Sequence, residues 1–403
     1  MKAALLGLSH PHSGILLTTL ENLTEITSVC LWDADPAVVA GPALPASRKV
    51  VQTTADLAAV LAQPDLDFAI VCVRNDQAAA LAHRVVAAGK HLLAEKPGGL
   101  TAAEILGVDQ AAERAGVVAG VLYARRAHPC VVAARRLVQS GALGPLLTLE
   151  SRFLTTQVRF RNPSSWVFRR REAGGGILLW LGCHCLDLLQ YVPGDEITEV
   201  AALLATRSGE AIDVEDTAAL ALKFRSGAVG TFHAGYTLAY SGEGYLNSGG
   251  YDSYLGFNGR TGRVVWPDLN PRLNVESPPA AGQSPVREET FALPASTSYG
   301  GAVGEDLFRP FLSAVQSKST PPATLADAVR TARIIEAAEE SARSGRFVRV
   351  ERAVGERVTA QFHAPSFAGG INSGLRKMEA PAPLNFTPGR GLNIRGDDGH
   401  HRP

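Results

Sequence analysis

The sequence is poor in the features that mark secreted, membrane-bound and nucleic-acid-binding proteins. Five cysteines in 403 residues, an odd number without a CxxC pair, provide no disulfide framework and indicate a reducing compartment. Lys and Arg together number 39, as do Asp and Glu, so no excess charge favours nucleic acid or an anionic membrane. We therefore expect a cytoplasmic protein that binds neither nucleic acid nor a membrane.

Long apolar runs are also missing. Met1 and Lys2 lead directly into AALLGL, without the charged start, long apolar segment and cleavage site of a signal peptide. The most apolar later stretch, residues 176–192, is interrupted by His184 and Asp187, so we do not expect it to span a membrane. The chain does contain 46% hydrophobic and 19% charged residues, the composition of a globular protein with a substantial core.

Hydrophobic periodicity divides the chain into parts. In residues 1–125 short apolar strands alternate with amphipathic helices, which predicts an α/β domain with a Rossmann-type, doubly wound parallel sheet. Residues 126–350 are dominated by strand-like runs and short turns, which predicts an α+β substrate and oligomerisation domain with a large, mostly antiparallel open sheet. Helices are expected at 176–191, 305–318 and 325–344, the last two packing back on the first domain. Residues 351–403, rich in Gly, Pro and Arg, are expected to form a tail or an arm.

The turn after the first strand has part of a nucleotide-binding pattern. A glycine turn between a strand and a helix presents backbone N–H groups to a pyrophosphate. Gly7 is the first glycine of the usual GxGxxG pattern, but Ser9 and His12 stand where the other two are expected. Asp33 ends the second strand, where an acid accepts hydrogen bonds from the ribose hydroxyls and repels a 2′-phosphate. This arrangement favours NAD over NADP, although Asp33 could instead be a simple turn residue of DADP.

The stretch HLLAEKPGGL at 91–100 holds a second chemical signal. Lys96 follows a buried strand, at the edge where open α/β sheets bind their ligands, and partial burial there suits a lysine for proton transfer. The alternative is an exposed lysine beside a turn. A metal is not expected: His10-x-His12 and Cys183-His184-Cys185 are ligand types, but neither has a second half at zinc-site spacing.

Over about residues 1–350 the chain resembles the Gfo/Idh/MocA family, the NAD(P)-dependent oxidoreductases named for glucose–fructose oxidoreductase and inositol dehydrogenase. The resemblance rests on LAAVLAQPDLDFAIVCV at 57–73, on AAGKHLLAEKPGGL ending at Leu100, on GALG at 141–144 and on GGGILLWLGCHCLDL at 174–188. It implies that Lys96 and His184 face the substrate beside the nicotinamide and carry the catalysis.

The resemblance also implies the binding residues. The cofactor is expected to contact Gly7, Leu8, Ser9, His10, Pro11, His12, Asp33, Val73, Arg74, Asn75, Glu95 and Lys96. The substrate is expected to contact Tyr123, Arg126, Arg159, Arg161, Arg169, Trp180, His184 and Asp187. The open sheet is expected to join the chain into a homo-oligomer, a dimer or a tetramer.

The sequence departs from the family pattern at several positions. Family members commonly have an aspartate four residues before the histidine; here that position is Trp180, whose ring could face a sugar or the nicotinamide, or simply be core. The Pro-Asn after the third strand of the family pattern is Arg74-Asn75, and the histidine that often follows is Ala78. Simple alcohol oxidation by the usual set of residues is therefore not the sole interpretation.

An arginine cluster, defined here as Arg152, Arg159, Arg161, Arg169, Arg170 and Arg171, precedes the GGG motif. Guanidinium groups suit carboxylates, phosphates and sulfonates, so the substrate could carry an anionic group; the alternative is a solvated edge or a subunit contact.

Three functions stay open. The first is an NAD-dependent dehydrogenase or reductase of a sugar, cyclitol or sugar derivative. The second is an NAD-dependent glycoside hydrolase that works by transient C3 oxidation, elimination and re-reduction. The third is a non-catalytic dinucleotide-binding sensor.

Overall fold

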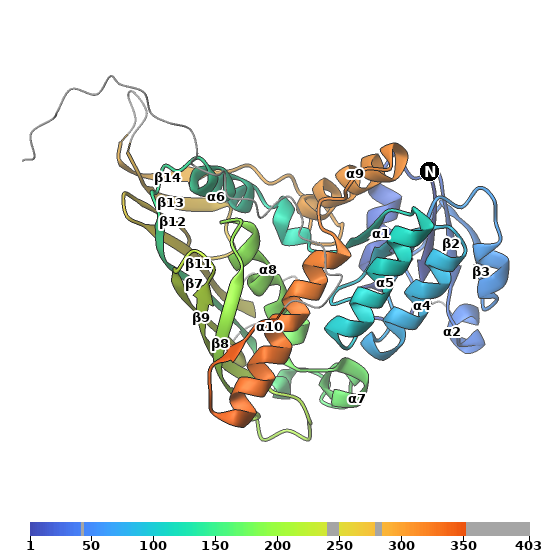
Figure 1. Cartoon of the computed structure of the whole chain (residues 1–403). Helices are drawn as coiled ribbons and strands as arrows, with labels where there is room; N and C mark the ends of the chain where they lie inside the picture. Colours follow the sequence, from blue (N-terminus) through green and yellow to red (C-terminus); the bar gives the residue numbers. More distant parts are fainter. Residues whose placement is uncertain (42–43, 240–249, 279–283, 352–403) are drawn as a thin grey trace, which may run out of the picture. The chain divides into compact units, whose positions relative to one another are not determined.

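The structure, a computed structural model, describes residues 1–41, 44–239, 250–278 and 284–351 (Figure 1). All of them belong to a unit that comprises Met1–Ala364. Of the tail expected at 351–403, all but Glu351 lies outside the described residues.

The first sheet has six parallel strands in the order β3-β2-β1-β4-β5-β6. They are β1 (Lys2–Leu6), β2 (Ser28–Trp32), β3 (Val50–Thr54), β4 (Phe68–Val71), β5 (His91–Ala94) and β6 (Ala119–Val121). The predicted doubly wound parallel sheet is confirmed. The sequence pattern missed β3, an edge strand whose residues are half-buried or exposed and so show no apolar run.

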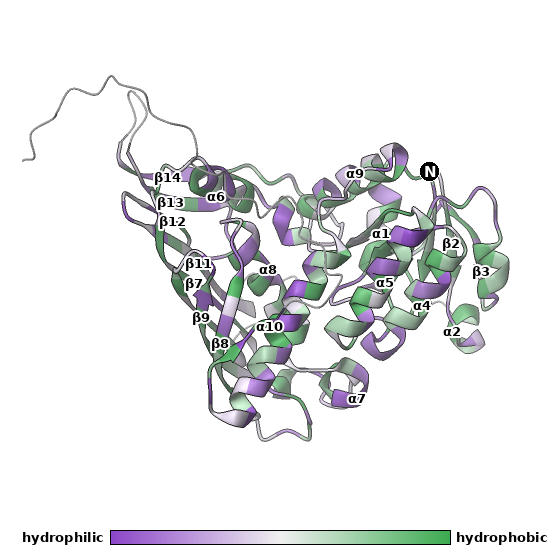
Figure 2. Cartoon of the chain, in the orientation of Figure 1, coloured by the Kyte–Doolittle hydropathy of each residue, from purple (hydrophilic) through white to green (hydrophobic). Residues whose placement is uncertain are grey.

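Five helices connect these strands: α1 (Ser13–Asn22), α2 (Pro36–Ala40), α3 (Leu57–Leu61), α4 (Asn75–Ala87) and α5 (Ala102–Ala115). The start and end of α5 follow from local chemistry. The Thr101 side chain accepts a hydrogen bond from the Glu104 N–H, and Gly116 ends the helix in the left-handed conformation. Figure 2 shows both hydrophilic and hydrophobic residues on α4 and α5, as expected for helices with one buried face.

The second sheet has nine strands in the order β14-β13-β12-β11-β7-β10-β9-β8-β15. They are β7 (Leu146–Thr156), β8 (Ile197–Ala205), β9 (Thr217–Phe224), β10 (Val229–Leu238), β11 (Tyr251–Gly259), β12 (Arg263–Trp266), β13 (Arg272–Glu276), β14 (Val286–Thr290) and β15 (Val348–Arg349). Only the β7–β10 pair is parallel among these pairings, so the expected mostly antiparallel sheet is confirmed. β12 pairs antiparallel with both β11 and β13.

Helical segments precede and interrupt these strands along the chain: η1 (Ala124–Ala127), α6 (Pro129–Gln139), η2 (Val158–Phe160), η3 (Trp166–Phe168), α7 (Arg170–Ala173), η4 (Leu178–Gly182) and α8 (Cys183–Tyr191). The single helix expected at 176–191 was wrong in detail, because η4 is a π-helical turn that leads into α8. Periodicity could not distinguish the two, since nearly every side chain of this stretch is buried.

The two late helices, α9 (Ala302–Ser317) and α10 (Leu325–Ser344), contact the first domain. Phe311 of α9 meets Phe68 of β4 edge to face, with ring centroids 5.5 Å apart. In Figure 1, α10 runs between α5 and β8, and it contacts both. This helix therefore joins the two sheets into one core. Across the described part of the chain, no helix is both long and apolar enough to cross a bilayer.

Candidate active site

The turn after β1 is shaped by Gly7. Its φ of +105° is strained for other residues, and a Cβ atom there would lie 2.1 Å from the carbonyl oxygen of Cys72. The Gly7 N–H donates to the Trp32 carbonyl, and the Ser13 hydroxyl at the start of α1 donates back to the Gly7 carbonyl (2.7 and 2.8 Å). The predicted residues Leu8, Ser9, His10, Pro11 and His12 complete this turn, which lies at the carboxyl end of β1. A dinucleotide phosphate fits such a turn.

Asp33 lies beside this turn, at the end of β2. One carboxylate oxygen accepts the Leu8 N–H at 2.8 Å and the other accepts the Asp35 N–H at 3.0 Å. Each oxygen has two lone pairs, so the carboxylate keeps capacity for ribose hydroxyls while it holds the turn.

The predicted cofactor segment after β4 reaches toward α7. The Arg74 guanidinium pairs with Asp76 and with Glu172, each at 2.9 Å. The Asn75 amide donates to the Ala173 carbonyl at 2.7 Å and is buried. Val73, which precedes them, contacts the larger core cluster. These contacts connect the nucleotide edge of the first sheet to the loop before the GGG motif.

Lys96 is buried at the carboxyl end of β5, with 1% of its surface exposed. Its ammonium donates to the Trp180 carbonyl at 2.9 Å, lies 3.8 Å from a Glu95 carboxylate oxygen and lies 3.9 Å from the Trp180 ring centroid. Glu95 Oε1 in turn meets Nδ1 of His12 at 2.9 Å. An ammonium held between a carboxylate and an aromatic face is well placed to hold or transfer a proton.

An aromatic cluster closes over this lysine. It consists of His10, His12, Trp166, Trp180 and Tyr299. The ring centroid of His10 lies 5.4 Å from that of Trp166 and 5.7 Å from that of Trp180. The ring centroid of His12 lies 5.6 Å from that of Trp180 and 5.0 Å from that of Tyr299. The two indoles meet edge to face at 5.6 Å. Four separate segments of the chain therefore meet at one aromatic site.

His184 begins the turn of α8 that follows the π-helical turn. Burial is the main cause that lowers its pKa well below the ordinary 6.5, with the nearby charges of Lys96 and Arg125 adding to the effect. Its Nδ1 is buried and has no hydrogen-bond partner among the described residues. The Tyr123 ring meets the imidazole at 5.8 Å. A neutral imidazole beside an ammonium can act as a base at neutral pH.

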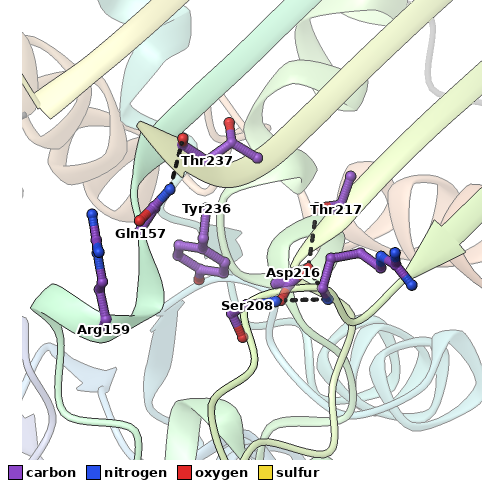
Figure 3. A pocket seen from close by; sticks show the side chains of 8 residues that line it. Gln157, Arg159, Ser208, Asp216, Thr217, Tyr236 and Thr237 are labelled. Carbon is purple, nitrogen blue, oxygen red and sulfur yellow. Dashed lines mark hydrogen bonds between the residues drawn. The ribbon is translucent and has the colours of Figure 1, made fainter. Parts of the chain in front are cut away.

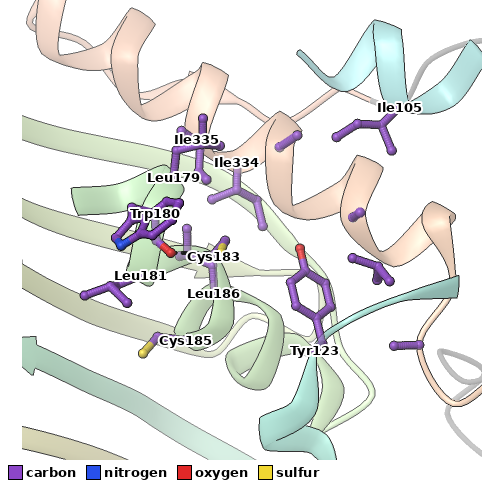
Figure 4. Close-up of a cluster of buried hydrophobic side chains, with 14 of the residues drawn as sticks. Ile105, Tyr123, Leu179, Trp180, Leu181, Cys183, Cys185, Leu186, Ile334 and Ile335 are labelled. Carbon is purple, nitrogen blue, oxygen red and sulfur yellow. Dashed lines mark hydrogen bonds between the residues drawn. The ribbon is translucent and has the colours of Figure 1, made fainter. Parts of the chain in front are cut away.

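The position of this helix depends on Glu215, which the sequence analysis did not single out. Its carboxylate accepts the N–H groups of Gly176 and Leu178 at 2.8 and 3.1 Å. A Cβ atom on Gly176 would lie 1.8 Å from the Glu215 carbonyl oxygen, so this approach requires glycine. In Figure 4 Trp180 and Leu179 of this segment lie beside Ile334 and Ile335 of α10.

Arg126 and Asp187, both predicted to bind substrate, are paired with each other. Two guanidinium nitrogens contact the Asp187 carboxylate at 2.9 and 2.5 Å, and a third contacts Asp327 at 3.0 Å. Arg330 closes the group by its bond to Asp327. All four side chains are buried, and this ion cluster joins η1, α8 and α10.

The predicted arginines separate in space. Arg169 donates to the Ala211 carbonyl at 2.8 Å, and Arg161 donates to Thr155 and Thr156 at 2.9 and 3.2 Å. Arg159 lines a cavity of about 160 Å³ together with Arg207, which was not predicted. Figure 3 shows Tyr236 between Arg159 and Asp216 in this cavity.

The sequence analysis missed several residues here. Trp166 of η3 and Tyr299 before α9 join the aromatic cluster, yet the sequence around an aromatic residue carries no signal of its partner. The described residues contain no group of three His, Cys, Asp or Glu side chains that could hold a metal ion.

Two family models match this chain. The model of the oxidoreductase family with an NAD-binding Rossmann fold matches residues 5–123, and that of the GFO/IDH/MocA C-terminal domain matches residues 131–264. Levoglucosan dehydrogenase of Pseudarthrobacter phenanthrenivorans is 27% identical over 53% of this chain, which spans 58% of that relative's length. Myo-inositol 2-dehydrogenase of Thermotoga maritima is 26% identical over 73% of this chain and 83% of its own.

A solved levoglucosan dehydrogenase in complex with NADH and levoglucosan has a similar structure. Its TM-score is 0.76, and the match covers 87% of this chain and 100% of that one at 22% sequence identity. This likeness supports the same two-sheet fold.

Proposed function

The chain belongs to the GFO/IDH/MocA family of oxidoreductases and has an NAD-binding Rossmann domain, and on this premise we propose that it transfers a hydride between the nicotinamide and a secondary alcohol carbon of a sugar, cyclitol or sugar derivative. In this proposal residues 1–125 hold the dinucleotide and residues 126–350 hold the substrate. The observation that carries it is the buried Lys96 between Glu95 and Trp180, with His184 of α8 near enough for the Lys96 charge to lower its pKa.

The residues divide the chemistry as follows. NAD, when bound, supplies the hydride acceptor. His184, kept neutral by burial, takes the hydroxyl proton, and the Lys96 ammonium donates a hydrogen bond to the same oxygen as negative charge develops on it. The Trp180 indole, in place of a carboxylate, lies against the Lys96 ammonium and holds it by a cation–π contact.

A substrate panel tests this function. Levoglucosan, myo-inositol and D-xylose are offered with NAD, and NADH is followed by its absorbance. Oxidation of at least one polyol is expected. If the protein is instead a redox-neutral glycosidase, a glycoside should release its aglycone without net formation of NADH. If it is a sensor without catalytic activity, neither NADH nor an aglycone should form.

The arginines refine the substrate class. Because Arg159 and Arg207 line the same cavity, we place an anionic group of the substrate there. D-Glucuronate and phosphorylated sugars are compared with their neutral parents on Arg159→Met and Arg207→Met variants. Equal activity of the parent on charged and neutral sugars would show that Arg159 and Arg207 do not bind an anionic group of the substrate.

The open face of the second sheet supports a homo-oligomer. Leu203 on β8 and Val229 on β10 are 77% and 53% exposed, and Ala219, opposite Leu203, and Ala221 on β9 lie on the same face. A second copy of this face would bury those side chains. Light scattering after size-exclusion chromatography is expected to report a dimer or tetramer, which Leu203→Glu weakens.

A further inference from the structure

His10 lies in the nucleotide-binding turn, yet its side chain points into the aromatic cluster. Its ring packs against Trp166 and Trp180, and the same Trp180 ring lies 3.9 Å from the Lys96 ammonium. Only 6% of the His10 surface is exposed. The imidazole is therefore adjacent to the proposed reaction centre rather than to solvent.

Hydrogen bonding determines which His10 nitrogen carries the proton. Nδ1 accepts the backbone N–H of His12 at 3.1 Å. Burial is the largest cause that lowers the His10 pKa well below 6.5, so the ring is neutral at neutral pH. A neutral imidazole whose Nδ1 is an acceptor carries its proton on Nε2. Nε2–H is thus a donor in the cluster.

This donor has no acceptor in the described part of the chain, because Nε2 is buried without a hydrogen-bond partner there. Five further buried atoms share that property: Nε of Arg263, Arg272 and Arg333, and, near Lys96, Oε2 of Glu95 and Nδ1 of His184. Most buried polar groups are hydrogen-bonded, so three such atoms around one lysine indicate groups that a ligand satisfies. Glu95 Oε2 supplies an acceptor where His10 supplies a donor.

We infer that His10 is a specificity-determining residue, whose Nε2–H donates to a substrate hydroxyl next to the reacting carbon, while Glu95 Oε2 accepts a hydrogen bond from a neighbouring hydroxyl. A vicinal polyol presents both kinds of group on adjacent carbons. The inference rests on the proposed function and extends it, because it names a residue of the nucleotide-binding turn that selects the substrate.

Direct binding tests the inference without turnover. Polyols are titrated calorimetrically into the protein saturated with NADH, and NADH itself is titrated by fluorescence. His10→Phe keeps an aromatic ring in the cluster but removes the donor, and His10→Gln restores a donor. We expect His10→Phe to weaken the best polyol at least tenfold, to leave NADH affinity within twofold, and His10→Gln to recover much of the loss. His83→Gln, an exposed histidine on α4, is the matched control.

Deoxy analogues of that polyol identify the hydroxyl. The analogue that lacks the hydroxyl bonded to His10 should bind the parent and His10→Phe with equal affinity. The other analogues should still bind the parent more tightly than His10→Phe. Equal polyol affinity of parent and His10→Phe overturns the inference and leaves the proposed function intact. Weaker NADH binding with unchanged polyol binding assigns His10 to the cofactor and overturns it too. A parent that binds no polyol overturns both. If His10→Phe does not fold, His10→Met is the non-donor variant.

Discussion

Replacement of Asp33 separates the two tasks of that carboxylate. In the absence of cofactor it holds the N–H groups of Leu8 and Asp35 at 2.8 and 3.0 Å, and with NAD bound we expect it to accept the ribose hydroxyls. Asp33→Ala removes all these bonds. Asp33→Asn keeps an oxygen for the Leu8 N–H but removes the negative charge.

The sizes of the effects follow from these contacts. A hydrogen bond to a charged group contributes about 1.5 to 3 kcal/mol, and Asp33 is half-buried, so the lower figure applies. Asp33→Ala should therefore lower the free energy of unfolding by about 2 to 3 kcal/mol, and Asp33→Asn by roughly half as much. Loss of the ribose bonds should weaken NAD about tenfold. Loss of the charge should narrow the preference for NAD over NADP in both variants.

Urea unfolding and fluorescence titration with both dinucleotides measure these quantities. Asp35→Ala is the matched control, because its exposed carboxylate caps α2 through the Ala37 N–H at 2.8 Å and faces no expected cofactor group. It should lose about 1 kcal/mol of stability and no NAD affinity. An NAD affinity of Asp33→Ala within twofold of the parent would refute the assignment, as would tighter binding of NADPH than of NADH by the parent.

Three further outcomes are expected. Lys96→Met and His184→Gln should each lower kcat at least ~100-fold in steady-state assays with NAD affinity kept within a few-fold, because the first removes the hydrogen-bond donor to the developing oxyanion and the second removes the base; half the parental rate would exclude that residue. Asp187→Ala leaves the buried Arg126 guanidinium without its bidentate partner and should lower the free energy of unfolding in urea by about 3 to 5 kcal/mol; a loss under ~1 kcal/mol would contradict the ion cluster. His128, buried against Trp266, has its pKa lowered by burial to about 4, below the unfolded value near 6.5. Between these pH values the unfolded state binds more protons than the folded state, so the free energy of unfolding should fall by up to ~3 kcal/mol as pH drops from ~6.5 to ~4. The urea midpoint measured as a function of pH checks this. A His128→Gln variant whose midpoint falls as steeply with pH as that of the parent would contradict it.

The fold was predictable where side-chain periodicity is strong. The alternation of apolar strands with amphipathic helices predicted the parallel sheet, and β4 with its four buried residues was among the clearest signals. The elements that were missed or misplaced are those in which buried side chains do not alternate with exposed ones, because none of the side chains is buried or nearly all of them are. The edge strand β3 has no buried run, and the segment from Leu178 to Gly182 is buried throughout, so nothing in it distinguishes a π-helical turn from an α-helix.

The sequence indicated residues of the candidate site but not which residues they contact. The motif around Lys96 and the acid at Asp33 stand at strand ends, and the carboxyl ends of parallel strands meet at one edge of the sheet. Arg126 has the same kind of signal, yet the structure pairs it with Asp187 and Asp327. A charge in a sequence does not reveal whether it faces a ligand or another buried charge.

The sequence by itself determined the two sheet types, the glycine turn at Gly7 and the strand that ends just before Glu95 and Lys96. These depend on local backbone preferences and on the repeat of apolar residues, which a short window of sequence contains. Only the tertiary structure decided that His12 meets Glu95 and that Lys96 meets Trp180, residues 83 and 84 positions apart. Such contacts arise where separately formed elements dock, and their hydrogen bonds depend on distances of about 3 Å that no local pattern encodes.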